Sequence, residues 1–209
     1  EFVKNVSASM VSMVINVQLM KHFGQDGVSS YGIIAYVWLI FAACFIGYNV
    51  AVSPRISYAY GAQNKAELRS LLRKSLIILI SFGLFQFAFA EAMAIPIAKI
   101  YAGYDEGLME LTVKASCIYS IIYLVLGINM FGSSFFTALN NGLASMALSF
   151  LRLALLEIGF VLLFSFLLGG YGVFWGVVVA EIVGLGINLF FFFAYRNKYG
   201  YGKSAGDMN

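Results

Sequence analysis

Three ionisable side chains in the apolar stretches of this sequence have the types and spacing to do chemistry. Arg152 and Glu181 each lie about ten residues inside neighbouring apolar segments, and Glu157 follows Arg152 in the same segment. Charged groups inside long apolar segments are costly, so they mark ion or substrate sites by default. An arginine can pair with a carboxylate, and an unpaired carboxyl can carry a proton or bind a cation.

Arg152 and Glu181 are expected at the same depth, because an α-helix rises about 1.5 Å per residue and the two segments run antiparallel. The favoured interpretation is a buried ion pair that holds two helices in register. The alternative is that Glu181 is a protonatable residue in a cavity. Either role would place this pair at the centre of the protein.

Glu157 is expected to point away from Arg152, by about 140° at 100° per residue of a regular helix. It cannot then easily share the guanidinium group, and burial of an unpaired carboxyl favours its neutral form. Glu157 is therefore a proton carrier or a ligand for a substrate cation. The alternative is a protonated acid that hydrogen-bonds a neighbouring helix.

Three further side chains are secondary candidates for a transport path. Glu91 lies in the outer third of its apolar segment, where an acid can also stay in contact with water. Asn16 and Asn129 are buried amides, and amides inside a membrane commonly bond between helices, a role shared by Gln18, Gln86 and Asn188.

The elements that position these residues are membrane-spanning helices. Of the 209 residues, 61% are hydrophobic and 11% are charged, and the mean hydropathy is +0.86. The apolar residues form long blocks instead of amphipathic stripes, as in an integral membrane protein. The net charge of +3 is what membrane topology alone produces, so no nucleic-acid partner is indicated.

The expected fold is all-α, a polytopic membrane protein with a bundle of six transmembrane helices. Each apolar block is long enough to cross a bilayer core. The short links make neighbouring spans antiparallel. The predicted spans cover residues 5–23, 31–54, 75–98, 114–139, 143–168 and 171–195.

The distribution of basic residues orients the bundle. If the spans alternate, nine of the 13 basic residues share the face of the N-terminus: Lys4, Arg55, Lys65, Arg69, Arg73, Lys74, Arg196, Lys198 and Lys203. The positive-inside rule makes this face cytoplasmic. We therefore expect a multi-pass protein of the cell inner (plasma) membrane with both chain ends in the cytoplasm.

A polar string at residues 53–64 closes the second span. Pro54 removes a backbone donor and is expected to kink or end the helix there. Asn64 is a suitable N-cap with Glu67 three residues on. A surface helix is predicted to begin at Asn64 and to run into the third span.

The sequence indicates neither an enzyme nor a cofactor. Catalysis inside the membrane would need a nucleophile with a base, or clustered metal ligands. His22 is the only histidine, no Asp lies within a predicted span, and Cys44 and Cys117 lie in apolar runs where a thiol acts as a small hydrophobe. We expect no metal, no cofactor and no catalytic residue.

Four strings together resemble the MATE (multidrug and toxic compound extrusion) transporter family. The first is SPRISYAYGAQNKAELRSLLRKSL, residues 53–76, similar to the string that ends the second helix of a six-helix lobe. The other three are FFTALNNGLASMALSFLRLALL at 135–156, GYGVFWGVVVAEI at 170–182 and INVQLMKHFGQDGVSSYGI at 15–33. Their order covers nearly the whole chain.

The resemblance implies a fold of twelve helices in two lobes, of which residues 1–209 look like the C-terminal lobe. The chain begins with Glu1 instead of Met, so we expect an internal piece of a longer protein. Its partners would be membrane lipids and a missing N-terminal lobe or a second copy of this lobe.

The implied function is a secondary active antiporter that exports cationic or amphipathic drugs or toxins by alternating access of two lobes. Family members place ion or substrate ligands on the first and fourth helices of this lobe, which favours Asn16 and Asn129. Sodium-coupled members carry carboxylates there, and these spans contain none, so a proton gradient is favoured over sodium. The alternative is a flippase for a lipid-linked sugar or polyprenyl intermediate.

Overall fold

A computed structural model describes residues 2–202 of the chain, with side chains for residues 6–202. This part of the chain is helical and contains no strand, which confirms the all-α prediction. The helices are α1 (Phe2–Gly61), α2 (Lys65–Ala102), α3 (Glu106–Ser120), α4 (Tyr123–Ala138), α5 (Gly142–Phe150), the π-helix η1 (Leu151–Leu156), α6 (Glu157–Leu168) and α7 (Gly170–Tyr199).

The helices are long and apolar enough for a membrane protein. Four helical stretches qualify as spans by length and composition, and the bent pair α3–α4 brings the number to five. The 60-residue α1 joins two helices at Gly24, whose φ of 63° and ψ of −143° are not helical. Counting α1 as two helices gives the six segments that the sequence predicts.

Two predicted boundaries in α1 are wrong. The link expected at residues 24–30 is helical except at Gly24, because one glycine with positive φ is enough to turn the chain. The helix also continues through Pro54 to Gly61, so the second span does not end where it was predicted. Proline removes one backbone hydrogen bond, and membrane helices tolerate this loss when their neighbours pack around it.

The predicted start of the third helical segment is confirmed. The Asn64 side chain accepts a hydrogen bond from the Glu67 backbone N–H at 3.0 Å, and its amide donates to the Glu67 carboxylate at 3.1 Å. This reciprocal cap satisfies donors at the helix start. From there α2 runs without a break to Ala102, so surface helix and span form one element.

The predicted fourth span, residues 114–139, is broken and not continuous. Helix α3 ends at Ser120 and α4 begins at Tyr123, with a bend of 50° between them. The Ser120 hydroxyl lies 2.8 Å from the Cys117 carbonyl oxygen and 2.5 Å from Oε1 of Glu91. A side chain that bonds to nearby backbone competes with the regular helix, so Ser120 favours the break.

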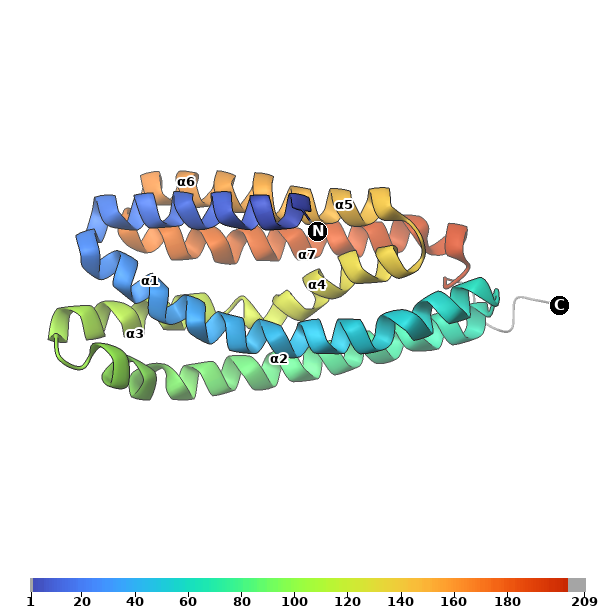
Figure 1. Ribbon diagram of the computed structural model, residues 1–209, viewed down its shortest axis with the longest axis horizontal. Helices are drawn as coiled ribbons and strands as arrows, with labels where there is room; N and C mark the ends of the chain where they lie inside the picture. Colours follow the sequence, from blue (N-terminus) through green and yellow to red (C-terminus); the bar gives the residue numbers. More distant parts are fainter. Residues whose placement is uncertain (1, 203–209) are drawn as a thin grey trace.

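The turns alternate between the two ends of the bundle. The α1–α2 turn, the α4–α5 turn and the end of α7 lie at one end, and Gly24, the α2–α3 turn and the α6–α7 turn lie at the other (Figure 1). The first end, here called the basic end, carries Arg55, Lys65, Arg69, Arg73, Lys74, Arg196 and Lys198. The Lys4 side chain and Lys203 lie outside the described residues.

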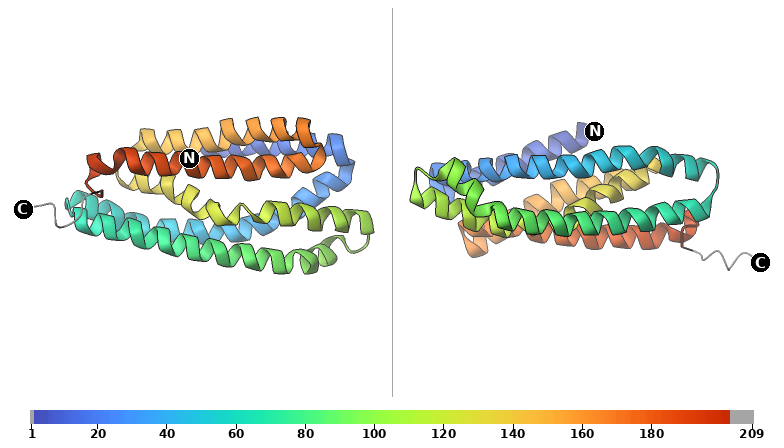
Figure 2. Two further views of the ribbon diagram at one scale, coloured as in Figure 1. Left: turned by 180° about the vertical axis from the view of Figure 1, so that it is seen from behind. Right: turned by 90° about the horizontal axis from the view of Figure 1, so that it is seen from below.

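Helix α7 is the element around which the candidate residues gather. The first part of α1, the α5–α6 stretch and α7 lie side by side, while the second part of α1 packs beside α2 (Figures 1 and 2). Buried aromatic rings fix α4 to α7, with Phe192 contacting Phe135 and Phe136 at centroid distances of 5.5 and 5.7 Å. Large apolar side chains such as Phe166 are exposed, as expected for a lipid-facing surface.

Candidate functional site

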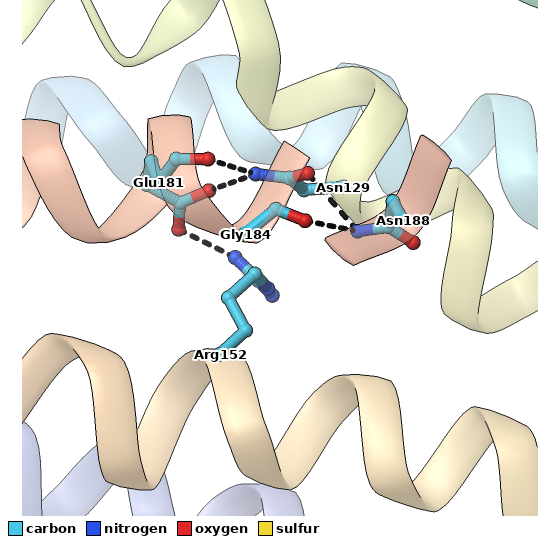
Figure 3. A network of polar contacts seen from close by, with 5 residues as sticks. All are labelled: Asn129, Arg152, Glu181, Gly184 and Asn188. Carbon is cyan, nitrogen blue, oxygen red and sulfur yellow. Dashed lines mark hydrogen bonds and ion pairs between the residues drawn. The ribbon is translucent and has the colours of Figure 1, made fainter. Parts of the chain in front are cut away.

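The predicted ion pair between Arg152 and Glu181 is present. Arg152 Nη1 lies 2.6 Å from Oε1 of Glu181, and the two side chains are only 14% and 6% exposed. Arg152 comes from η1 and Glu181 from the middle of α7, on facing helices (Figure 3). The depth argument from sequence therefore confirms the pair itself.

Two asparagines complete a polar network around the carboxylate. Asn129 of α4 donates to Oε2 of Glu181 at 2.6 Å and to its backbone carbonyl at 2.9 Å. Asn188, which follows Glu181 by seven residues on α7, donates to Asn129 Oδ1 at 3.0 Å and to the Gly184 carbonyl at 3.2 Å (Figure 3). Both Glu181 carboxylate oxygens are thus bonded, one to a cation and one to an amide.

Two glycines make room for this polar network. A Cβ added at Gly132 of α4 would lie 1.8 Å from Oδ1 of Asn188, an atom that is buried without a hydrogen-bond partner among the described residues. A Cβ at Gly184 would lie 3.2 Å from Arg152 Cγ and 3.4 Å from Asn129 Nδ2. Close approach of α4, η1 and α7 therefore depends on residues without side chains.

The π-helix changes the direction in which Glu157 points. The Glu157 backbone N–H bonds to the Arg152 carbonyl, five residues earlier, as in a π-turn and not an α-turn. The angle of about 140° expected from a regular helix is therefore wrong for this stretch. π-Bulges of this kind are frequent at functional sites.

Glu157 is the unpaired acid of the site. Its side chain is half-buried and forms no hydrogen bond or ion pair within residues 6–202, as expected for an acid that does not share Arg152. It lies within electrostatic reach of both Arg152 and Glu181. The charges of the three side chains therefore act on one another.

Two tyrosines from other helices face the same region. Tyr31 of α1 lies within electrostatic reach of Glu157 and hydrogen-bonds Ser12. Tyr119, at the end of α3, is buried and lies within reach of Glu157, Glu181 and Tyr31. Side chains from α1, α3, η1 and α7 thus lie within electrostatic reach of Glu157 of α6.

The net charge of the site determines what it can bind. With all groups ionised, Arg152 contributes one positive charge while Glu181 and Glu157 contribute one negative charge each. The site then carries one uncompensated negative charge in a largely buried place. Such a charge is costly unless it is neutralised by a proton or paired with a cation.

The other predicted residues lie elsewhere. The Asn16 amide donates to the Ser12 carbonyl at 2.8 Å, within its own helix, and makes no hydrogen bond to the polar network. Glu91 contacts Ser120 at the α3–α4 break. The structure therefore brings together Asn129, Arg152 and Glu181, with Glu157 nearby. Asn16 is linked to this region only through Ser12, which also bonds to Tyr31, and Glu91 lies apart.

Sequence reasoning missed several parts of the site. Asn188 carried only the general signal of an amide in a span, and no pattern marked Tyr31, Tyr119 or Gly132. Gly172, Gly176, Ala180 and Gly184 recur every four residues in the sequence, a pattern that indicates close helix packing and not a role for Gly184 in the site. Among the described residues no group of three His, Cys, Asp or Glu side chains could hold a metal ion.

Comparison with known proteins identifies the family and the fold. Residues 2–163 match the model of the MatE family. An inward-facing multidrug resistance MATE family transporter of the MOP superfamily matches with a TM-score of 0.89 and 18% identity, over 97% of this chain and 47% of that one. An outward-facing one matches with 0.88 and 18%, over 94% and 44%.

A third solved structure, a MATE in complex with MaL6, matches with a TM-score of 0.88 and 19% identity, over 95% of this chain and 45% of that one. The chain thus spans less than half the length of the solved proteins that it resembles. A sequence search of curated proteins found no match. At these identities the structural matches establish the fold.

Proposed function

Because the chain belongs to the MatE family, we propose that it is the C-terminal lobe of a secondary active antiporter that exports cationic or amphipathic compounds. The family is one of transporters, so a role other than catalysis fits. Coverage of 45% of a solved MATE chain supports a second lobe, supplied by an N-terminal half or by another copy. The coupling ion in this proposal is the proton.

The charge of the site is the observation on which this proposal depends. One uncompensated negative charge among Arg152, Glu157 and Glu181 can accept one proton or one monovalent cation, but not both. Mutually exclusive binding of two ligands to one site is the requirement for exchange transport. The arrangement therefore suits the exchange of a cationic substrate for a proton.

Arg152 connects the two acids. While Glu181 is ionised it holds Arg152 at 2.6 Å, and Glu157 is left to bind a cation. When a proton neutralises Glu181, the pair is lost and Arg152 is released toward Glu157. The guanidinium then replaces the substrate cation at Glu157, so proton entry expels the substrate.

Alternating access requires that each lobe keeps its internal fold while the two lobes move. The chain matches an inward-facing and an outward-facing MATE structure almost equally, with TM-scores of 0.89 and 0.88. This similarity supports motion of a lobe as one body. In this proposal the basic end is cytoplasmic in the inner (plasma) membrane, as the positive-inside rule indicates.

Two alternatives are less well supported. Sodium coupling would favour carboxylates on the first and fourth spans, whereas the polar side chains there are amides such as Asn16 and Asn129. A flippase for a lipid-linked anion would need free positive charge in the cavity. Arg152 is paired with Glu181 and does not provide it.

The test is efflux by the full-length protein in proteoliposomes with an imposed proton gradient. Glu157→Gln should abolish cation export because it removes the uncompensated charge. Glu181→Gln should leave Arg152 free to occupy Glu157 and should likewise stop export. Glu106→Gln, an exposed acid at the start of α3, is the matched control and should retain wild-type export.

Proton-driven export at the wild-type rate by both variants, with normal expression, would contradict the assignment of the exchange site. Flipping of a lipid-linked substrate without any cation export would instead support the flippase alternative. Replacement of the proton gradient by a sodium gradient identifies the coupling ion in the same assay.

A further inference from the structure

Four hydroxyl groups form a continuous chain between α4 and α5. The Thr137 and Ser145 hydroxyl oxygens are 2.7 Å apart, those of Ser145 and Ser133 2.9 Å, and those of Ser133 and Ser149 2.7 Å. We call these four side chains the hydroxyl chain. Each step is a normal O–H···O hydrogen bond in length.

The hydroxyl chain leads from the surface into the protein. Thr137 is exposed and lies next to the α4–α5 turn at the basic end, whereas Ser133, Ser145 and Ser149 are 8%, 6% and 6% exposed. A polar path of this kind is unusual in an apolar helix pair. It connects the exposed Thr137 hydroxyl, beside the α4–α5 turn, with a buried region.

The inner end of the hydroxyl chain lies one helical turn from the polar network. Ser133 follows Asn129 by four residues on α4, and Ser149 precedes Arg152 by three residues at the start of η1. Residues three or four apart on a helix share a face. Both inner hydroxyls are therefore neighbours, along their helices, of residues that hold Glu181.

The hydroxyl chain can be polarised in either direction. A hydroxyl has one proton to donate and two lone pairs to accept. Each link can be donated from either side, and Thr137 and Ser133 have the Ser133 and Ser145 carbonyls as further acceptors at 3.0 and 3.3 Å. Reversal of the donors lets a proton enter at one end while another leaves at the other.

We propose that the hydroxyl chain relays protons between the basic end and Glu181. A proton taken up by the Thr137 oxygen displaces the proton of Thr137 to Ser145, and so on through Ser133 to Ser149. Each hydroxyl gains one proton and loses one, so none is consumed. In this proposal a bridging water completes the path from the inner end of the hydroxyl chain to the Glu181 carboxylate.

Simple packing would not require four linked hydroxyls. Between α1 and α4, the hydroxyls of Ser53 and Ser134 form a pair with oxygens 3.0 Å apart, and no third side-chain hydroxyl among the described residues extends it. Ser134 adjoins Ser133 on the same helix but has no bond to the hydroxyl chain. It therefore offers a control of the same residue type, in the same helix turn, without the proposed role.

This inference rests on the proposed proton coupling, and its test uses the full-length protein in proteoliposomes. Proton uptake after a pH jump and substrate binding are measured for Ser133→Ala, Ser149→Ala and Ser134→Ala. We expect proton uptake to slow at least about tenfold in the first two variants, since positioned proton donors contribute this much or more. Substrate affinity and thermal stability should stay unchanged, and Ser134→Ala should behave as wild type.

Three results would overturn the relay. One is unchanged proton uptake in both Ser133→Ala and Ser149→Ala, while the wild type still couples to protons. Another is a parallel loss of substrate affinity, which indicates a structural role. The third is equal slowing by Ser134→Ala. Absence of proton-coupled transport in the wild type itself is a different result, because it refutes the proposed function as well.

Discussion

Two segments of α7 contact their neighbours in opposite ways, a first segment with Gly172 and Gly176 and a second segment with Glu181 and Asn188. Over its first part, Gly172 and Gly176 let α7 approach the backbone of α6 so closely that an added Cβ would lie 1.9 Å and 2.6 Å from atoms of that helix. Over its second part, Glu181 and Asn188 contact η1 and α4 through charged and amide groups. One contact is apolar and close, and the other is polar.

The difference indicates separate roles for the two contacts. Close packing of small residues stabilises helix pairs in a membrane and contains nothing that titrates. A buried ion pair contributes little net stability, because desolvation offsets much of the attraction. The polar contact of the second segment is therefore retained for chemistry, whereas the first segment holds α6 and α7 together.

The largest effect on stability is expected in the second segment of α7, on removal of one member of the ion pair. Arg152→Met leaves the Glu181 carboxylate buried beside Asn129 without its cation, which should cost about 3–5 kcal/mol of stability. The double variant Arg152→Met/Glu181→Met should recover most of this loss. Thermal unfolding in detergent measures both, and equal stability of the single variant and the wild type would refute a buried pair.

A smaller effect on stability is expected in the first segment of α7. Gly172→Ala places a Cβ against the Phe164 carbonyl and should destabilise the α6–α7 contact by about 1–3 kcal/mol. Gly186→Ala, in the same helix with nothing within 4 Å of the added Cβ, is the control. The Tm values of the two variants in detergent are compared, and equal values would show that α6 and α7 are not in close contact.

The smallest effect is expected for an acid outside both contacts. Glu91→Gln keeps a hydrogen-bonding group beside Ser120 at the α3–α4 break, so stability should change by less than about 1 kcal/mol. Proton-driven export should stay at the wild-type rate because the variant leaves the exchange site intact. Loss of export in this variant would show that the exchange site extends beyond Arg152, Glu157 and Glu181.

Sequence reasoning located the ion pair because depth in an antiparallel pair of helices follows from residue counting. Arg152 and Glu181 are also rare residue types in such segments, so few combinations existed. Asn129 and Asn188 could not be distinguished from the other amides, since an amide signals only that some partner is near. That Asn188 bonds to Asn129, and Asn129 to Glu181, depends on how α4 packs against α7.

The irregular backbone was the other feature that could not be predicted from the sequence. The break at Ser120 and the π-helix at Leu151–Leu156 have no composition that separates them from regular apolar helix. Pro54 was expected to kink or end the helix, and the helix does not end there because only one backbone hydrogen bond is lost. The direction of Glu157 depends on the π-helix, so its surroundings had to come from the structure.

The central claim is that one uncompensated negative charge in the lobe is shared between a proton and a cationic substrate. Counting protons released when the full-length protein binds a cationic substrate, in weakly buffered detergent solution, tests this most directly. We expect the wild type to release a proton and Glu157→Gln to release none. Equal release by the variant and the wild type would contradict it.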